Sequence, residues 1–155
     1  QLANEVLESA ISDEDLQQLL DEFQALLGDT RITGCLSRTA YPSLSDAELK
    51  VENERPIADR EGNRLLVGNI DRLVTAYDRK SGQPIAADIL DFKTDIIMPG
   101  DEKTLNKKVR YYQPQLQAYR RAVQRITNLP PDKVTARLLF TYPRRVMSVD
   151  DRTDS

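Results

Sequence analysis

Histidine is absent from this chain of 155 residues, and cysteine occurs once, at Cys35. Without an imidazole, the chain cannot use histidine as a general base or as a metal ligand. A single thiol cannot close an internal disulfide or build a cysteine-ligated zinc or iron–sulfur site. Mechanisms that need an imidazole, an internal disulfide or a cysteine-ligated metal site are therefore excluded within this chain.

Long apolar runs are also missing, and the chain shows no signal peptide, so we expect a cytoplasmic protein that does not enter a membrane. The net charge is -3, which gives no bulk preference for nucleic acid. Hydrophobic residues make up 39% and charged residues 30%, as in an ordinary globular domain. Because the chain begins with Gln1 and ends in a polar stretch, we expect it to be a piece of a longer protein.

The first part of the chain favours helix. Ser12 and Asp15 resemble a capping box, leucines follow at helical spacing, and Gly28 ends the run. This pattern predicts an ordinary amphipathic helix that packs on the rest of the domain. Residues 29–47 indicate a loop with a short element near residues 32–36.

The middle of the chain predicts three consecutive strands. They cover residues 50–57, 64–77 and 84–94, and turn signals fill residues 59–63 and 78–83. Connections of this length make neighbouring strands antiparallel, so we expect a β-meander.

The last part of the chain predicts helix and then strand. Residues 105–112 favour a short helix, and a main helix is expected from Pro114 to Ile126, because proline suits a first helical position better than an interior one. Residues 134–142 and 145–149 favour strands. The order of elements predicts a mixed α/β domain whose sheet is covered by helices.

Asp91-Phe92-Lys93 is the most informative motif, because it closes an otherwise apolar strand. Side chains alternate along a strand, so Asp91 and Lys93 point the same way. Burying such a pair is costly without compensation, which a metal ion and a phosphate would provide. Asp71 lies in the preceding strand, on a face that we expect it to share with Val67, Asn69 and Leu73. The alternative is a chance triplet that forms a surface ion pair.

Basic residues gather in the stretch after this motif, with tyrosines between them. This pattern suits single-stranded nucleic acid through phosphate pairing and base stacking. A solvated helix face with partly buried tyrosines explains it equally well. The basic residues are Lys103, Lys107, Lys108, Arg110, Arg120, Arg121 and Arg125.

Three blocks resemble the RecB/AddA-type branch of the PD-(D/E)XK nucleases. They are Gly68-x-x-Asp71, then Asp91-Phe92-Lys93-Thr94, then Gln115-x-x-x-Tyr119. Glu54-Arg55-Pro56-Ile57 also resembles a segment that precedes the first block in AddA-type domains. The resemblance covers roughly residues 48 to 142 and implies a restriction-endonuclease-like fold, with a central mixed sheet flanked by helices.

The resemblance also implies roles for individual residues. Asp71 and Asp91 match the acidic ligands of Mg²⁺ or Mn²⁺, and the carbonyl of Phe92 would face the metal too. Lys93 matches the lysine that orients the attacking water and stabilises charge on the phosphate. Further residues would line the site, assist the metal or contact DNA: Gln115 and Tyr119, Glu54 as an accessory, and Lys103, Lys107, Lys108, Arg110 and Arg120.

The chain departs from the family pattern in lacking the upstream histidine ligand that many members carry. It also lacks the four cysteines of the iron–sulfur members and has no phosphate-binding loop of a helicase motor. We therefore expect residues 1–47 to form a helical segment, residues 48–150 a cluster-free nuclease core, and residues 151–155 a disordered tail. The motor would lie elsewhere in the same polypeptide.

Two functions remain in play. The first is a magnesium-dependent deoxyribonuclease, exonuclease or endonuclease, that acts on single-stranded DNA ends within a helicase-nuclease for recombination and repair. The second is a DNA-binding or scaffolding domain that keeps the fold without hydrolysis. Intact Asp71, Asp91 and Lys93 favour the first. A restriction-type endonuclease is less favoured because of Gln115 and Tyr119.

Overall fold

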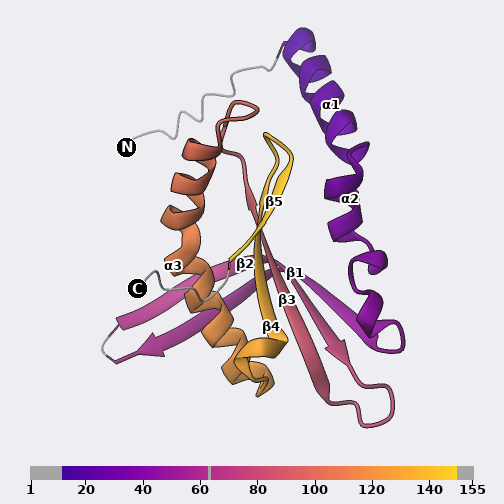
Figure 1. The fold of residues 1–155 in the computed structure, drawn as a ribbon, viewed down its shortest axis with the longest axis vertical. Coiled ribbons are helices and arrows are strands. Elements are labelled where there is room, and N and C mark those ends of the chain that lie inside the picture. The colour runs from indigo at the N-terminus through magenta and orange to yellow at the C-terminus, as the bar shows by residue number, and fades with distance from the viewer. Residues whose placement is uncertain (1–11, 63, 150–155) are drawn as a thin grey trace, which may run out of the picture.

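The computed structural model describes residues 12–62 and 64–149 (Figure 1). The expected disordered tail, residues 151–155, lies outside these ranges. No helix within them is long and apolar enough to cross a membrane. The main elements are α1 (Asp13–Leu27), α2 (Thr30–Leu36), β1 (Glu48–Glu61), β2 (Arg64–Tyr77), β3 (Pro84–Lys93), α3 (Glu102–Thr127), β4 (Val134–Phe140) and β5 (Arg145–Ser148).

The strands form one mixed sheet in the order β1-β2-β3-β4-β5. Neighbouring strands are antiparallel except β3 and β4, which run parallel. A parallel pair needs a crossover connection, and α3 supplies it here. The expected mixed α/β class, the three-stranded meander and the two later strands are confirmed.

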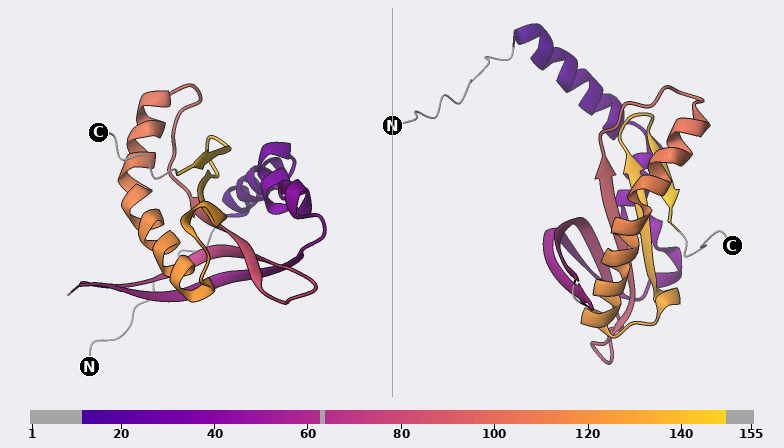
Figure 2. Two further views of the ribbon diagram at one scale, coloured as in Figure 1. Left: turned by 60° about the horizontal axis from the view of Figure 1, so that its bottom comes forward. Right: turned by 90° about the vertical axis from the view of Figure 1, so that its left-hand side faces the viewer.

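Helices cover the sheet on both faces (Figures 1 and 2). The larger core lies between the sheet and α3, and Ile89, Leu116 and Leu138 are fully buried in it. A smaller core lies under α2, where Ile32 and Cys35 pack with Leu90 and Leu139. Because side chains alternate along β3, Ile89 faces α3 and Leu90 faces α2.

The β1–β2 hairpin changes the face that it presents to α3 at its midpoint. Ile70 and Leu73 both belong to the α3 core, although their positions differ by an odd number. Glu54, which lies opposite Asp71, has a positive φ of 50°. The expected shared face of Val67, Asn69, Asp71 and Leu73 is therefore wrong: Val67 is 70% exposed, whereas Leu73 is buried.

One continuous helix replaces the two that the sequence predicted between residues 102 and 127. Asp101 caps its start by accepting from the Thr104 N–H at 3.0 Å, and Asn128 ends it in the left-handed conformation. Pro114 lies inside this helix, and it is exposed. Packing of Leu105 and Leu116 in the same core holds both halves, so tertiary contacts override the local preference against proline.

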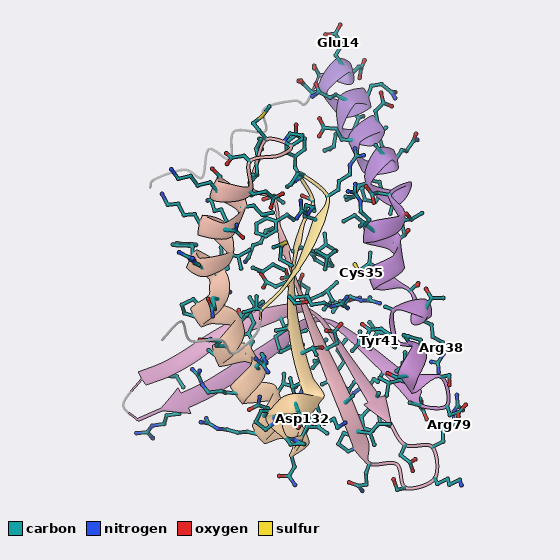
Figure 3. The ribbon with its side chains drawn as sticks, in the orientation of Figure 1. Glu14, Cys35, Arg38, Tyr41, Arg79 and Asp132 are labelled. Atoms are coloured by element: carbon teal, nitrogen blue, oxygen red, sulfur yellow. The ribbon has the colours of Figure 1, made fainter. Side chains whose placement is uncertain are left out.

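The first helix begins and ends as predicted but does not pack as predicted. Ser12 accepts from the Asp15 N–H at 3.1 Å, and Gly28 follows the last turn. The helix extends away from the sheet, with Glu14 at its outer end (Figure 3). None of its residues is buried, and Leu19 and Phe23 are more than half exposed. In the described part of the chain, only Leu26, near the end of this helix, packs against the smaller core, and the rest of its apolar face is exposed.

A buried polar cluster joins β3, β4 and the segment before β1 on the α2 side of the sheet. Asp88 is 5% exposed and forms an ion pair with Arg137. It also accepts from the Tyr41 hydroxyl at 2.8 Å and from the Thr135 hydroxyl at 2.6 Å. Several donors thus compensate the burial of one carboxylate.

Removing the charge partner of Asp88 tests this cluster. We expect Arg137→Met to lower the free energy of unfolding by about 2–3 kcal/mol, because the carboxylate stays buried with only its two neutral donors. Urea unfolding followed by circular dichroism measures this, since the chain has no tryptophan. Arg79→Met, at an exposed arginine, is the control and should cost about 0.5 kcal/mol or less. Equal losses in the two variants would contradict the prediction.

Candidate active site

The central feature is a fork where β2 and β3 separate. Their pairing ends at Arg72 and Leu90, but β3 continues beside β4 as far as Lys93. Beyond the separation, the Asp71 side chain takes the place of a backbone partner and accepts from the Phe92 N–H at 2.7 Å. The fork therefore brings Asp71 to the backbone that carries Asp91.

Asp91 is a buried carboxylate with incomplete hydrogen bonding. It is 2% exposed, and its Oδ2 has no partner in hydrogen-bond geometry among the described residues. Burial raises the pKa of Asp91, the nearby charge of Lys93 lowers it, and the charge of Asp71 raises it again; the net pKa lies above its usual value. An unsatisfied buried oxygen of this kind is a position where a cation would be favoured.

Lys93 lies beside Asp91, as strand alternation predicts. Its Nζ is 2.5 Å from Asp91 Oδ2, which makes an ion pair although the angle of approach is poor for a hydrogen bond. The same Nζ lies 4.1 Å from the ring centroid of Tyr112, within cation–π range. Only 14% of the Lys93 side chain is exposed, so the ammonium group is held within the fold.

Two carboxylates and a carbonyl are the oxygen ligands that the fork offers to a metal. The Lys93 carbonyl accepts from the Thr141 N–H on the β4 side, so the Phe92 carbonyl, one residue earlier, faces Asp71. Mg²⁺ accepts such a set, because it needs only one or two carboxylates and otherwise uses water and substrate phosphate. No cluster of three or more His, Cys, Asp or Glu side chains forms in residues 12–62 and 64–149. Glu54, which is exposed, therefore does not add a third carboxylate to Asp71 and Asp91.

Gln115 and Tyr119 lie together on α3, and Tyr119 lies against β2 at Gly68, three residues before Asp71. The Gln115 amide donates to the Tyr119 hydroxyl at 2.9 Å, and Tyr119 is 3% exposed. A Cβ on Gly68 would lie 2.7 Å from the Tyr119 hydroxyl oxygen. Gly68, from the first sequence block, thus contacts Tyr119, from the third block.

The basic residues expected to contact DNA fall into three groups. Lys103, Lys107 and Arg110 are exposed on the first half of α3. Lys108 forms an ion pair with Asp95 at 2.6 Å. Arg120 differs from the expectation: it is 8% exposed, and it donates to the carbonyls of Val134 and Pro131. Its guanidinium anchors α3 to the start of β4 and is not free to contact DNA.

Tyr112 and Asp95 are neighbours of the site that the sequence analysis did not place there: Tyr112 was among the tyrosines expected to stack on nucleic-acid bases, and Asp95 had no assigned role. The Tyr112 hydroxyl donates to Asp95 Oδ2 at 2.9 Å while its ring contacts Lys93. A signal was present, because Asp95 continues the alternation of Asp91 and Lys93, and Tyr112 follows Lys108 by one helical turn.

Comparison with known proteins gives a family match over nearly the whole chain. Residues 1–153 match the family model described as the PD-(D/E)XK nuclease superfamily. A search of curated proteins found no match.

The contact between Gly68 and Tyr119 can be tested by adding one methyl group. We expect Gly68→Ala to lower the free energy of unfolding by roughly 1–3 kcal/mol, because buried Tyr119 has little room to move. The matched control is Gly34→Ala in α2, where nothing lies within 4 Å of the added methyl group. That change should leave stability equal or raise it by about 0.5–1 kcal/mol. Urea unfolding compares the two; a harmless Gly68→Ala would disprove the close contact.

Proposed function

The chain belongs to the PD-(D/E)XK nuclease superfamily, and from this premise we propose that it hydrolyses phosphodiester bonds in DNA at the fork between β2 and β3. The observation that carries the proposal is Asp91: a buried carboxylate that forms an ion pair with Lys93 without a well-aligned hydrogen bond, and whose pKa is raised further by the charge of Asp71. A structural ion pair uses only one carboxylate, whereas a divalent cation can use both.

We propose that Asp71, Asp91 and the Phe92 carbonyl hold Mg²⁺ or Mn²⁺. When bound, the cation would supply positive charge to the scissile phosphate and would make a nearby water more acidic. Hard oxygen ligands suit either ion. The absence of histidine does not prevent this chemistry, because neither the cation nor the water needs an imidazole.

Lys93 is proposed to orient the attacking water and to stabilise negative charge on the phosphate. Its ammonium already lies beside Asp91, so no large movement is needed to bring it to a phosphate bound there. Gln115 and Tyr119 are proposed to line the same site from α3. Their mutual hydrogen bond fixes the amide, whose remaining polar atoms can contact DNA or Lys93.

DNA is proposed to approach along the first half of α3. Exposed Lys103, Lys107 and Arg110 provide positive charge on the helix that also carries the site residues. Local potential steers a strand even when the domain is acidic overall. We further propose a preference for single-stranded ends and a place in a RecB/AddA-like helicase-nuclease, where this domain would follow a motor in the same polypeptide and serve recombination or repair.

A non-hydrolytic DNA-binding or scaffolding role remains the second candidate. It is favoured by one observation: the described side chains form no cluster of three metal-binding groups. The two candidates differ in whether a divalent cation binds at Asp71 and Asp91 and whether DNA is then cut.

Cleavage of labelled oligonucleotides tests the proposed chemistry. With Mn²⁺ and single-stranded DNA, we expect Lys93→Ala to lower kcat by roughly 100-fold or more, because a charge aimed at the transition state is lost. Lys80→Ala, at an exposed lysine in the β2–β3 turn, should leave the rate unchanged. Duplex and single-stranded substrates, with free or blocked ends, then separate exonuclease from endonuclease action. A Lys93→Ala protein that cuts at the parent rate would exclude the proposed role.

Metal binding has a readout that does not depend on cleavage. At Mn²⁺ concentrations about 100-fold above Kd, we expect the melting temperature of the parent to rise by roughly 5–10 °C. Asp71→Asn and Asp91→Asn should lose this rise, whereas Asp132→Asn, at an exposed position, should keep it. Differential scanning calorimetry with and without Mn²⁺ gives the comparison. A parent protein that does not respond to the ion would favour the scaffolding role.

A further inference from the structure

Tyr112 occupies a position between the proposed lysine and a second ion pair. Its ring face contacts the Lys93 ammonium at 4.1 Å, and its hydroxyl donates to Asp95 Oδ2 at 2.9 Å. One side chain thus connects a residue of the DxK motif to the segment that follows β3.

Asp95 is tied to α3 at two points. It accepts from Tyr112, and its Oδ1 lies 2.6 Å from Lys108 Nζ. Lys108 and Tyr112 are one helical turn apart, so both reach the same carboxylate from one face of the helix. Burial raises the pKa of Asp95, but Lys108 and Tyr112 outweigh it and hold the pKa below its usual value. The carboxylate is therefore charged near neutral pH and keeps both contacts.

We propose that Tyr112 is a positioning residue for Lys93: its ring holds the ammonium over the fork, and Asp95 with Lys108 fixes the ring. The kinetic part of this proposal rests on the proposed nuclease function. The geometric part does not.

The chemistry of Lys93 explains why a ring is suited to this task. A lysine side chain is long and flexible, and loses side-chain entropy when it is held. A second carboxylate would hold the ammonium by taking its N–H groups. An aromatic face attracts the positive charge through its quadrupole and takes none of the three N–H donors in a directed hydrogen bond. Apart from its contact with Asp91, the ammonium therefore keeps donors for a phosphate oxygen or a water.

The ring and the hydroxyl make separable contributions. Tyr112→Phe keeps the ring that contacts Lys93 and loses only the hydrogen bond to Asp95, which Lys108 still holds. Tyr112→Leu removes the ring but keeps an apolar side chain against the α3 core, where Tyr112 packs. If Tyr112 only stabilised the fold, its replacement would affect the core in general and would not act specifically on Lys93.

Kinetics on folded variants test the positioning role. For Tyr112→Leu we expect kcat to fall roughly 10- to 100-fold with KM for DNA unchanged, as when a supporting residue of a site is lost. Tyr112→Phe should stay within roughly threefold of the parent, because the ring is retained. The control, Tyr77→Leu, makes the same change at the last residue of β2, beside the β2–β3 turn and away from the fork, and should leave kcat unchanged.

A nuclear magnetic resonance measurement tests the geometry independently. In protein labelled with ¹³C at the lysine ε-carbons, the Lys93 signal is assigned by its loss in Lys93→Ala. We expect its protons to be shifted upfield by the Tyr112 ring, the shift to persist in Tyr112→Phe and Tyr77→Leu, and the shift to disappear in Tyr112→Leu. Should Tyr112→Leu fail to fold, Tyr112→Met offers a flexible apolar replacement that fills irregular space.

The outcomes separate the two proposals. If the parent does not cleave DNA, the nuclease function fails, and the Lys93 signal still decides whether Tyr112 holds the lysine. If the parent cleaves and Tyr112→Leu cleaves equally well, the positioning role is overturned and the nuclease function stands. It is also overturned if Tyr112→Phe loses as much activity as Tyr112→Leu, or if the parent shows no upfield shift at Lys93.

Discussion

The hydrogen bond from the Phe92 N–H to the Asp71 carboxylate is the contact on which the site depends. When two strands separate, the backbone groups between them lose their strand partners and need other ones. Asp71 satisfies this N–H with a side chain while its strand turns away (Figure 2). The same carboxylate thereby bridges the fork and lies close enough to Asp91 for its charge to raise the Asp91 pKa. A structural need and a proposed metal-binding role fall on one residue.

Much of the fold could be predicted because local signals agreed with the final structure. Turn residues divided the middle of the chain into the observed meander, and the strand predicted over residues 84–94 is β3, which ends one residue earlier, at Lys93. The relative placement of Asp91 and Lys93 followed from strand alternation alone. Their closeness could therefore be predicted without knowledge of the tertiary fold.

The features that the sequence did not predict depend on contacts between distant segments. Pro114 suggested a helix start, but packing on both sides of it keeps α3 continuous. The change of face near Glu54 and Asp71 involves residues that look ordinary in a strand, so strict alternation placed Val67 and Leu73 together. Arg120 resembled the other basic residues of its helix, and only the position of β4 shows that its guanidinium serves an anchoring role.

Among the charged groups around the site, the carboxylate of Asp91 is less well compensated than that of Asp95. At the end of β3 and in the segment after it, each carboxylate has an ammonium partner: Asp91 pairs with Lys93, and Asp95 pairs with Lys108 of α3. Asp95 also gains the Tyr112 hydroxyl, whereas Asp91 has a poorly aligned contact and a second carboxylate nearby. The excess of negative charge is thus confined to Asp91 and Asp71, at the fork. A divalent cation at that point would neutralise both carboxylates and leave Lys93, held by an aromatic ring, with its donors directed to the substrate.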